Sequence, residues 1–235
     1  MATYDKFAKF YDLVIGDRRS NVVLINKIMK KNNSKAKKIL ELACGTGAIL
    51  KPLSRKYEVF GLDASGEMLK AAREKLPKAK LYKQNMVNFK VDDNFDVILC
   101  VFDSINHLLK FNEWEKVFKS AYNHLNKGGI FIFDMNTKKQ FKRLTSQLPV
   151  IKEFNNNFNI IKITGTNTAA TWHVKVFEYQ KNDKYRLIKE DIKEKTFPID
   201  RIKRSLKKIY RKVDVLDFSK DALRRGERLY FICKI

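Results

Sequence analysis

The stretch Ile39-Leu40-Glu41-Leu42-Ala43-Cys44-Gly45-Thr46-Gly47 is the part of the sequence that decides the fold. Its first five residues are apolar apart from one carboxylate, which is typical of a short strand buried in a parallel sheet. Gly45 and Gly47 allow the backbone to turn tightly and to approach a ligand closely. The apolar residues from Ala48 onward predict a helix whose free N–H groups point at that ligand. The stretch therefore predicts a strand–turn–helix unit with a ligand lying over the glycines.

A second acidic residue indicates which kind of ligand this is. Residues 59–63 predict a second strand that ends on Asp63, and in an open α/β sheet such an acid can hold the two ribose hydroxyls of an adenosine. A nicotinamide fingerprint requires a third glycine, where this chain has Leu50. Glu41 suits a cationic ligand better than a pyrophosphate. The pattern therefore favours S-adenosylmethionine, which carries an ammonium, a sulfonium and no phosphate.

The run from Glu41 to Gly47 resembles the first motif of the class I S-adenosylmethionine-dependent methyltransferases. The family pattern has three alternate glycines, and Ala43 stands at the first of them, a small replacement that should keep the turn. Residues 4–12, Tyr-Asp-Lys-Phe-Ala-Lys-Phe-Tyr-Asp, resemble the leader that many of these enzymes place over the methionine end of the cofactor. The resemblance covers residues 1–137 and implies a methyltransferase core.

Two further segments carry the same resemblance. Gln84-Asn85-Met86 matches the position where the family usually has an aspartate that accepts a hydrogen bond from the adenine amino group. Asn85 stands in its place, and its side-chain carbonyl can still accept that bond without charge. Residues 95–98 and 102–108 resemble the fourth strand and the loop that lines the methyl-transfer site. The resemblance implies the following cofactor-binding residues: Tyr4, Tyr11, Glu41, Ala43, Cys44, Gly45, Gly47, Asp63, Ala64, Met68, Asn85, Met86, Val101 and Phe102.

The remaining pattern alternates strands and helices, as a doubly wound sheet requires. We expect an α/β fold with a Rossmann-like, mostly parallel seven-stranded sheet and helices on both faces. β-Branched and aromatic residues then dominate residues 150–196, with turn formers between them, which predicts three or four antiparallel strands. This small antiparallel β cap is inserted after strand five, so the core comprises residues 1–149 and 197–235. The cap loosely resembles small-molecule N-methyltransferases, including amino-sugar N,N-dimethyltransferases.

Few side chains are candidates for catalysis, because methyl transfer depends mainly on holding nucleophile, methyl and sulfur in line. His107 follows the fourth strand at the expected mouth of the site, with Asp103 four residues earlier. Tyr11 is the third candidate, as a hydrogen-bonding partner of the acceptor. The alternatives are that His107 caps a helix or packs, and that Tyr11 is a core residue. At most one of Trp172 and His173 faces the pocket, since neighbouring strand residues point to opposite faces. The usual ligand spacings of a metal site are absent, so no metal is expected.

The sequence also indicates the cellular compartment of the protein. No apolar run approaches the ~20 residues of a membrane span, and residues 1–7 lack the basic and apolar layout of a secretion signal. The cysteines Cys44, Cys100 and Cys233 lie in or beside predicted strands, where reduced packing residues are expected. We therefore expect a cytoplasmic protein.

The net charge of the chain is compatible with more than one kind of methyl acceptor. Lys and Arg number 49 against 26 Asp and Glu, a net charge of +23, and the densest basic run is residues 201–212. Such a surface attracts phosphates, although a solvated helix gives the same pattern. The leading hypothesis is methyl transfer to a nitrogen or oxygen of a small molecule. The alternative is an RNA methyltransferase, for tRNA or rRNA, that uses the basic C-terminal third. A non-catalytic cofactor-binding or nucleic-acid-binding protein is the distant third.

Overall fold

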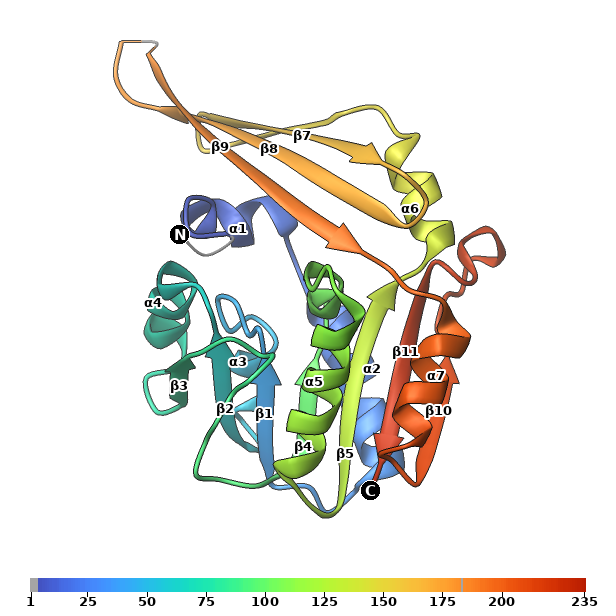
Figure 1. Ribbon diagram of the computed structural model, residues 1–235. Helices are drawn as coiled ribbons and strands as arrows, with labels where there is room; N and C mark the ends of the chain where they lie inside the picture. The colour runs from blue at the N-terminus through green and yellow to red at the C-terminus, as the bar shows by residue number, and fades with distance from the viewer. Residues whose placement is uncertain (1–3, 183) are drawn as a thin grey trace.

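The computed structural model describes residues 4–182 and 184–235, in which a large sheet lies below a smaller one (Figure 1). The first three residues of the segment considered above for a secretion signal lie outside the described residues. No helix in the described part of the chain is both long and apolar enough to cross a membrane.

The large sheet has seven strands in the order β10-β11-β5-β4-β1-β2-β3. Its strands are β1 (Lys38–Leu42), β2 (Glu58–Asp63), β3 (Lys80–Lys83), β4 (Phe95–Cys100), β5 (Leu125–Asn136), β10 (Lys212–Leu216) and β11 (Arg228–Lys234). All pairings are parallel except those of β11 with β5 and β10. The strand order reverses between β1 and β4, and in open α/β sheets ligands bind at the carboxyl ends of the strands beside such a point.

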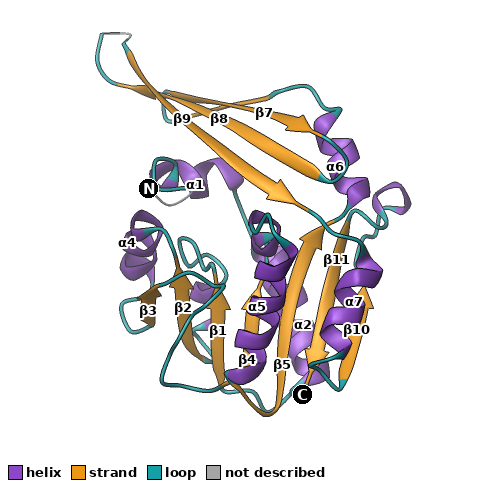
Figure 2. Ribbon diagram, viewed as in Figure 1, coloured by secondary structure: helices purple, strands orange, loops and turns teal. Residues whose placement is uncertain are grey.

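Helices cover both faces of this sheet (Figure 2). The helices of the described chain are α1 (Ala8–Ile15), α2 (Arg19–Asn32), α3 (Leu50–Leu53), α4 (Gly66–Lys75), α5 (Phe111–Asn123), α6 (Lys138–Thr145) and α7 (Ile199–Lys207), with short 3-10 turns at Ser104–His107 and Ala222–Arg224. Of these, α1 and α6 pack against the cap strands and not on the faces of the large sheet. Trp114 and Phe118 of α5 and Leu206 of α7 bury against one face. Helices α2, α3 and α4 bury apolar side chains against the other. The predicted mostly parallel seven-stranded sheet with helices on both faces is confirmed.

The smaller sheet has four antiparallel strands in the order β6-β7-β8-β9, and we call it the cap sheet. Its strands are β6 (Val150–Phe154), β7 (Asn157–Gly165), β8 (Ala169–Tyr179) and β9 (Tyr185–Lys195). It follows β5 and α6 in the chain and precedes α7, so the predicted antiparallel insertion after the fifth strand is confirmed. Val174, Val176 and Ile192 on its inner face pack against Phe7 and Phe10, so α1 lies between the cap sheet and the core (Figure 1).

The sequence analysis missed two helices and misplaced one boundary. The apolar stripe of α2 was overlooked, and α6 has few buried apolar residues to signal it. A Gly-Gly pair commonly ends a helix, so the sequence predicts that the helix containing Trp114 runs to Gly128-Gly129. In the structure α5 ends at Asn123 and both glycines lie within β5. The register between β4 and β5 shifts beside Phe95, and Gly128 adopts a φ of 77°, as a bulge with a left-handed residue requires.

Candidate functional site

A cavity of about 350 Å³ opens at the carboxyl ends of β1, β2 and β4, the point where the strand order reverses. Its walls come from the leader, the glycine turn, the ends of β2 and β3, and the loop after β4. The lining residues are Tyr4, Tyr11, Ala43, Gly45, Leu62, Asp63, Ala64, Met68, Gln84, Asn85, Met86, Phe102, Ser104, His107 and Leu108. The topology and the local sequence therefore place the cavity at the same edge of the sheet.

The glycine turn alternates left-handed residues, with φ of 52° at Ala43, 55° at Gly45 and 73° at Gly47. A Cβ atom on Gly45 would meet no atom within 4 Å, because this position faces the cavity. A Cβ on Gly47 would lie 2.7 Å from Cδ1 of Leu76 in the turn after α4. The two glycines therefore serve different purposes: Gly45 leaves room over the turn, and Gly47 lets the turn pack on the protein.

Asp63 ends β2 at the cavity wall and accepts two backbone hydrogen bonds. The N–H groups of Gly45 and Ser65 each donate to one of its carboxylate oxygens at 2.8 Å. Burial raises the pKa of Asp63, while these hydrogen bonds oppose the shift. Each oxygen keeps one lone pair for a hydroxyl, so Asp63 can hold the glycine turn and a ribose at once.

The residues expected around the adenine lie on the same side of the cavity. Ala64, Met68, Asn85 and Met86 all line it. The two methionines are buried and supply apolar walls. The side-chain carbonyl of Asn85 already accepts the Val87 N–H at 2.9 Å, which leaves one lone pair for the hydrogen bond that the sequence predicts.

Four of the predicted cofactor residues do not line the cavity: Glu41, Cys44, Gly47 and Val101. Glu41 is buried, and its Oε2 atom has no hydrogen-bond partner among the described residues. Cys44 is a buried free thiol whose pKa is raised by burial, which keeps it protonated and unreactive. Cys100 and Cys233 are likewise buried and free.

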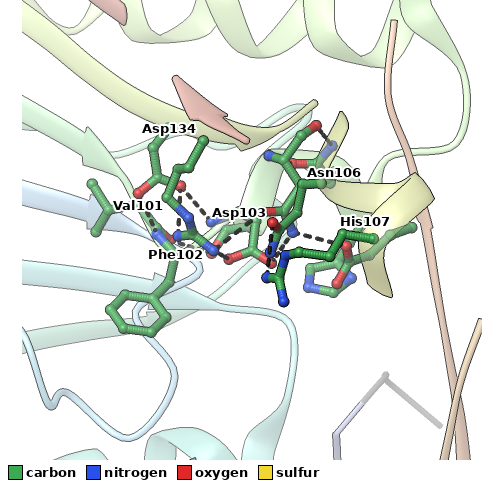
Figure 3. A network of polar contacts seen from close by, with 12 residues as sticks. Val101, Phe102, Asp103, Asn106, His107 and Asp134 are labelled. Carbon is green, nitrogen blue, oxygen red and sulfur yellow. Dashed lines mark hydrogen bonds and ion pairs between the residues drawn. The ribbon is translucent and has the colours of Figure 1, made fainter. Parts of the chain in front are cut away.

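The loop after β4 contains two consecutive left-handed residues, Phe102 and Asp103, with φ of 63° and 51°. Such a conformation costs of order 1–3 kcal/mol per residue and persists only where the surroundings enforce it. Asp134, on β5, does so (Figure 3): its carboxylate accepts the Phe102 N–H at 3.1 Å and the Asp103 N–H at 2.6 Å. Asp134 therefore fixes the turn that places the Phe102 ring in the cavity wall.

Arg228, on β11, completes this network. Its guanidinium lies 2.6 Å from Asp103 and 3.3 Å from Asp134, and both carboxylates are largely buried. Asn136 donates to the second oxygen of Asp103 at 2.7 Å. Asp103 is therefore held by Arg228 and Asn136, and no hydrogen bond joins it to His107 within the described residues. The side chain holds the loop in place and does not orient the imidazole.

His107 lies at the mouth of the cavity and hydrogen-bonds through both ring nitrogens. Nδ1 is 3.3 Å from the Lys193 carbonyl oxygen, and Nε2 is 3.2 Å from the Tyr4 hydroxyl. A carbonyl can only accept, so we assign the proton to Nδ1 and Nε2 accepts from Tyr4. Burial lowers the pKa of His107 and raises that of Tyr4 well above 10. Both side chains are therefore neutral at physiological pH, with the imidazole as the proton acceptor.

Tyr11 and the two cap residues considered from the sequence are also placed. The Tyr11 ring lines the cavity edge-on to Tyr4, with centroids 5.4 Å apart, and burial raises its pKa to about 12. Trp172 packs on the inner, α1-facing side of the cap sheet. His173 bonds instead to Thr164 and Asp191, each at 2.8 Å. Neither Trp172 nor His173 lines the cavity.

Arg18 is a site residue that the sequence analysis missed. It is 8% exposed, and its guanidinium carbon lies 4.9 Å from the Tyr11 ring centroid and 4.4 Å from that of Phe102. Its Nε and one terminal nitrogen have no hydrogen-bond partner among the described residues. Arg18 lies between two helices in a polar segment, where nothing in the local pattern distinguishes it from a solvated arginine.

Comparison with known proteins agrees with this geometry. Residues 39–129 match a family model described as a methyltransferase domain. A putative methyltransferase of Bacillus subtilis, YqeM, is 28% identical and the match covers 83% of this chain and 82% of that one. The crystal structure of an S-adenosylmethionine-dependent methyltransferase from Clostridium acetobutylicum is 26% identical, with a TM-score of 0.83 and coverage of 99% and 98%. The chain belongs to the class I S-adenosylmethionine-dependent methyltransferases.

A further relative of this methyltransferase has a named substrate. The dTDP-3-amino-3,4,6-trideoxy-alpha-D-glucopyranose N,N-dimethyltransferase of Streptomyces venezuelae is 29% identical over 47% of each chain. For most curated relatives the match spans about half of their length, for example 58% of the Geobacillus protein and 52% of the Streptomyces fradiae enzyme.

The residues present fit S-adenosylmethionine. The open space above Gly45 suits the cofactor over the turn, and Asp63 suits its ribose. Arg18 and Glu41 are buried, and each has a polar atom without a hydrogen-bond partner among the described residues. Burial raises the pKa of Glu41 and Arg18 opposes the shift, as expected where a buried charge lacks a close partner. The zwitterionic methionine end of the cofactor would supply a partner for each: a carboxylate for Arg18 and an ammonium for Glu41. No group of three or more His, Cys, Asp and Glu residues that could hold a metal ion was found among the described residues.

Replacing Arg18 with methionine tests this assignment. The variant should bind S-adenosylmethionine and S-adenosylhomocysteine about 10- to 100-fold more weakly, since it loses a charge-assisted hydrogen bond worth about 1.5–3 kcal/mol. Methylthioadenosine lacks the amino-acid end and should bind the variant and the parent protein equally. Titration calorimetry with the three ligands measures this. An equal loss for all three would mean that Arg18 supports the fold of the site and does not contact the carboxylate.

Proposed function

We propose that the protein transfers a methyl group from S-adenosylmethionine to the nitrogen of a small amine that enters between the core and the cap sheet. S-adenosylhomocysteine is the second product. In this proposal the chain has two parts: residues 1–149 and 197–235 form the core that binds the cofactor, and residues 150–196 form a cap that covers the substrate. The proposal also retains the predicted cofactor-binding residues, with Arg18 added, and the predicted catalytic residues His107 and Tyr11, while Asp103 fixes the loop after β4.

The observation that carries the proposal is the sign of the charge around the site. The chain has a net charge of +23, yet the groups in and behind the cavity are mainly acidic. They are Asp5, Asp63, Asp103, Asp134 and Glu190, against the cations Arg18, Arg228 and Lys6. Glu41 and Glu194 are not counted, because burial raises the pKa of Glu41 and raises that of Glu194 to about 8. Concentrated carboxylates attract cations. An amine reaches the site as its ammonium, and a neutral alcohol gains nothing from this field, which favours nitrogen over oxygen as the acceptor atom.

The site also offers a place for the proton. An ammonium must lose a proton before its nitrogen can attack, and the neutral imidazole of His107 can take it, either directly or through the Tyr4 hydroxyl at 3.2 Å. The cofactor supplies an activated methyl group. The fixed turn at Phe102 and Asp103 and the aromatic rings around it position the acceptor, and positioning supplies most of the rate.

Relatives and composition support the remaining parts of the proposal. Two curated relatives are named as N,N-dimethyltransferases of dTDP-linked amino sugars. Their acceptor atom is a nitrogen, and we extend this class of acceptor atom to the present protein. The three buried free cysteines suit a reducing compartment, so we also propose a cytoplasmic location.

The test is a methyl-transfer assay with radiolabelled S-adenosylmethionine and a panel of amines, amino sugars, nucleotide-linked amino sugars and matching hydroxyl analogues. We expect transfer to at least one amine and none to the analogue in which a hydroxyl replaces the amino group. Binding of the cofactor without transfer to any amine, together with transfer to an alcohol, would reject nitrogen as the acceptor atom.

Replacing His107 with alanine should lower kcat by about 10²-fold or more, because general base catalysis contributes of that order. The affinity for S-adenosylhomocysteine should change little. Burial lowers the pKa of His107 below 6.5. In the pH–rate profile of the parent protein, the acidic limb should therefore report this imidazole, with activity rising as the imidazole loses its proton. The variant should lose that limb. Initial rates between pH 5 and 9 measure this, and a fully active variant would return His107 to a structural role.

A further inference from the structure

Part of the excess positive charge lies at the edge of the large sheet opposite the cavity. The loops that lead into β1, β2, β3, β5 and β10 meet at the amino-end edge, the lower side in Figure 1. Exposed cations without an ion-pair partner among the described residues occupy these loops and the helix ends beside them. They are Lys30, Lys31, Lys35, Lys37, Arg55, Lys56, Lys78, Lys127, Lys208 and Arg211.

The carboxylates at this edge do not balance these cations. Asp93 pairs with Lys38 and Lys80, and Asp214 with Lys212. Asp96 accepts hydrogen bonds from two backbone N–H groups and Asn126. Glu58 and Asp92 are exposed at the same edge. Because the ten unpaired cations outnumber these acids, the edge still presents a positive field to the solvent. The carboxyl-end edge carries the acidic groups described above, so the two ends of the sheet have opposite character.

Two clefts open along the amino-end edge, and each combines a tyrosine with cations. Tyr57 shares the first cleft, beside the starts of β2 and β3, with four lysines and Glu58. Lys51 and Lys78 have no ion-pair partner among the described residues, whereas Lys75 pairs with Asp12 and Lys80 with Asp93. The second cleft lies beside the starts of β5 and β10, where Tyr122, 39% exposed, lies with Lys127 and Arg211. Phosphates attract cations, and exposed nucleic-acid bases stack on aromatic rings, a combination typical of surfaces that bind single strands.

We propose that the amino-end edge binds single-stranded RNA as a docking partner, separately from methyl transfer. A membrane fits this edge less well. Several of the large exposed apolar residues, such as Leu13, Ile15, Leu148 and Ile151, belong to α1, the start of β6 and the segment before it, and not to the basic loops. The RNA is also not the methyl acceptor in this arrangement, because the cavity opens at the other end of the strands. Docking there recruits the protein to RNA and leaves the active site free.

The test compares two variants that lose the same charge. The edge variant carries Lys35→Ser, Lys56→Ser, Lys78→Ser and Arg211→Ser. The cap variant carries Lys162→Ser, Lys175→Ser, Lys184→Ser and Lys189→Ser, all exposed positions on the cap sheet or its hairpin. Fluorescence anisotropy with a labelled 20-nucleotide oligouridylate, from 50 to 300 mM KCl, gives the affinity and its salt dependence. Titration with S-adenosylhomocysteine checks that both variants keep an intact cofactor site.

We expect the edge variant to bind the RNA at least about tenfold more weakly and to lose about 2–3 from the slope of log Kobs against log salt, the value for four lost phosphate contacts. The cap variant should retain both. If both variants lost the same RNA affinity, the effect would come from net charge and not from this edge, and the proposal would be overturned. The absence of salt-dependent RNA binding in the parent protein would also overturn it.

A third variant separates RNA from other polyanions. Tyr122→Leu keeps an apolar side chain beside Tyr210 and removes the ring on which a base would stack. We expect it to weaken RNA binding several-fold without changing the affinity for heparin, which is charged but has no bases. If Tyr122→Leu changed neither affinity, or if phosphatidylglycerol vesicles competed fully with the RNA, the edge would be a general anion-binding surface and the RNA assignment would be wrong.

Discussion

Replacing Gly45 with valine should abolish binding of S-adenosylmethionine and S-adenosylhomocysteine while the protein remains folded. Gly45 has a φ of 55°, and its missing side chain would project into open space at the cavity wall. Valine would place three carbons where the ligand approaches the turn, and steric overlap of that size leaves no productive pose. A loss of at least about 10³-fold in affinity, or more than 4 kcal/mol, is the expected result.

The same substitution at Gly128 is the matched control. Gly128 also has a positive φ, 77°, and open space around its missing Cβ, but it lies at the opposite edge of the sheet. Both variants suffer the steric cost of a left-handed residue, roughly 1–2 kcal/mol of stability. Only the Gly45 variant should lose the ligand in titration calorimetry. Normal affinity after Gly45→Val would mean that the cofactor does not lie over this turn.

Replacing Arg228 with methionine should destabilise the protein by about 3–5 kcal/mol, because it leaves buried carboxylates without their cation. Asp134 is 1% exposed and Asp103 is largely buried, and Arg228 is the cation that contacts both. The turn at Phe102 and Asp103 should then relax, since its anchor is a carboxylate that now lacks compensation. Urea unfolding at pH 7 measures the loss, and Arg225→Met, at an exposed neighbouring position, is the control.

The size of this loss should depend on pH. Burial raises the pKa of Asp134, and Arg228 opposes the shift, so the pKa rises further when the cation is removed. A carboxyl group whose pKa is raised by folding favours the folded state in its protonated form, so its penalty decreases as the pH falls. The deficit of the Arg228 variant should therefore be smaller at pH 5 than at pH 7. A deficit that is small and equal at both values would mean that Asp134 is not an uncompensated charge.

The sequence predicted those parts of the site that lie within single strand–turn units. Gly45, Asp63 and Met86 each follow a strand, and because parallel strands end at one edge of the sheet, short patterns sufficed to bring them together. The mostly parallel sheet followed from the alternation of strands and helices, and the inserted antiparallel sheet from the β-branched and aromatic residues at 150–196. No comparable local pattern exists for residues whose role depends on distant partners.

Arg18, Asp134 and Arg228 are such residues. The two charges that Arg228 neutralises lie 94 and 125 positions away in the chain, and periodicity within a strand carries no information on such pairs. The expected partnership of Asp103 with His107 was inferred from closeness in sequence. In the structure Asp103 instead contacts Arg228 and Asn136. A left-handed turn and a 3-10 turn separate its side chain from that of His107.

The position of the leader, residues 4–12, has a consequence for how the cofactor and the acceptor affect each other's affinity. Glu190 of the cap sheet accepts hydrogen bonds from the N–H groups of Tyr4 and Phe7, and Ser65 beside Asp63 donates to Asp5. The leader thus joins the segment after β2, beside Asp63, to the cap sheet, the two parts of the chain that would hold the adenosine and cover the acceptor in the proposed function. A ligand that orders the leader from one side lowers the entropy cost of ordering it from the other. By linkage the effect is mutual: cofactor raises the affinity for acceptor by the same factor as acceptor raises the affinity for cofactor, with no direct contact between them required.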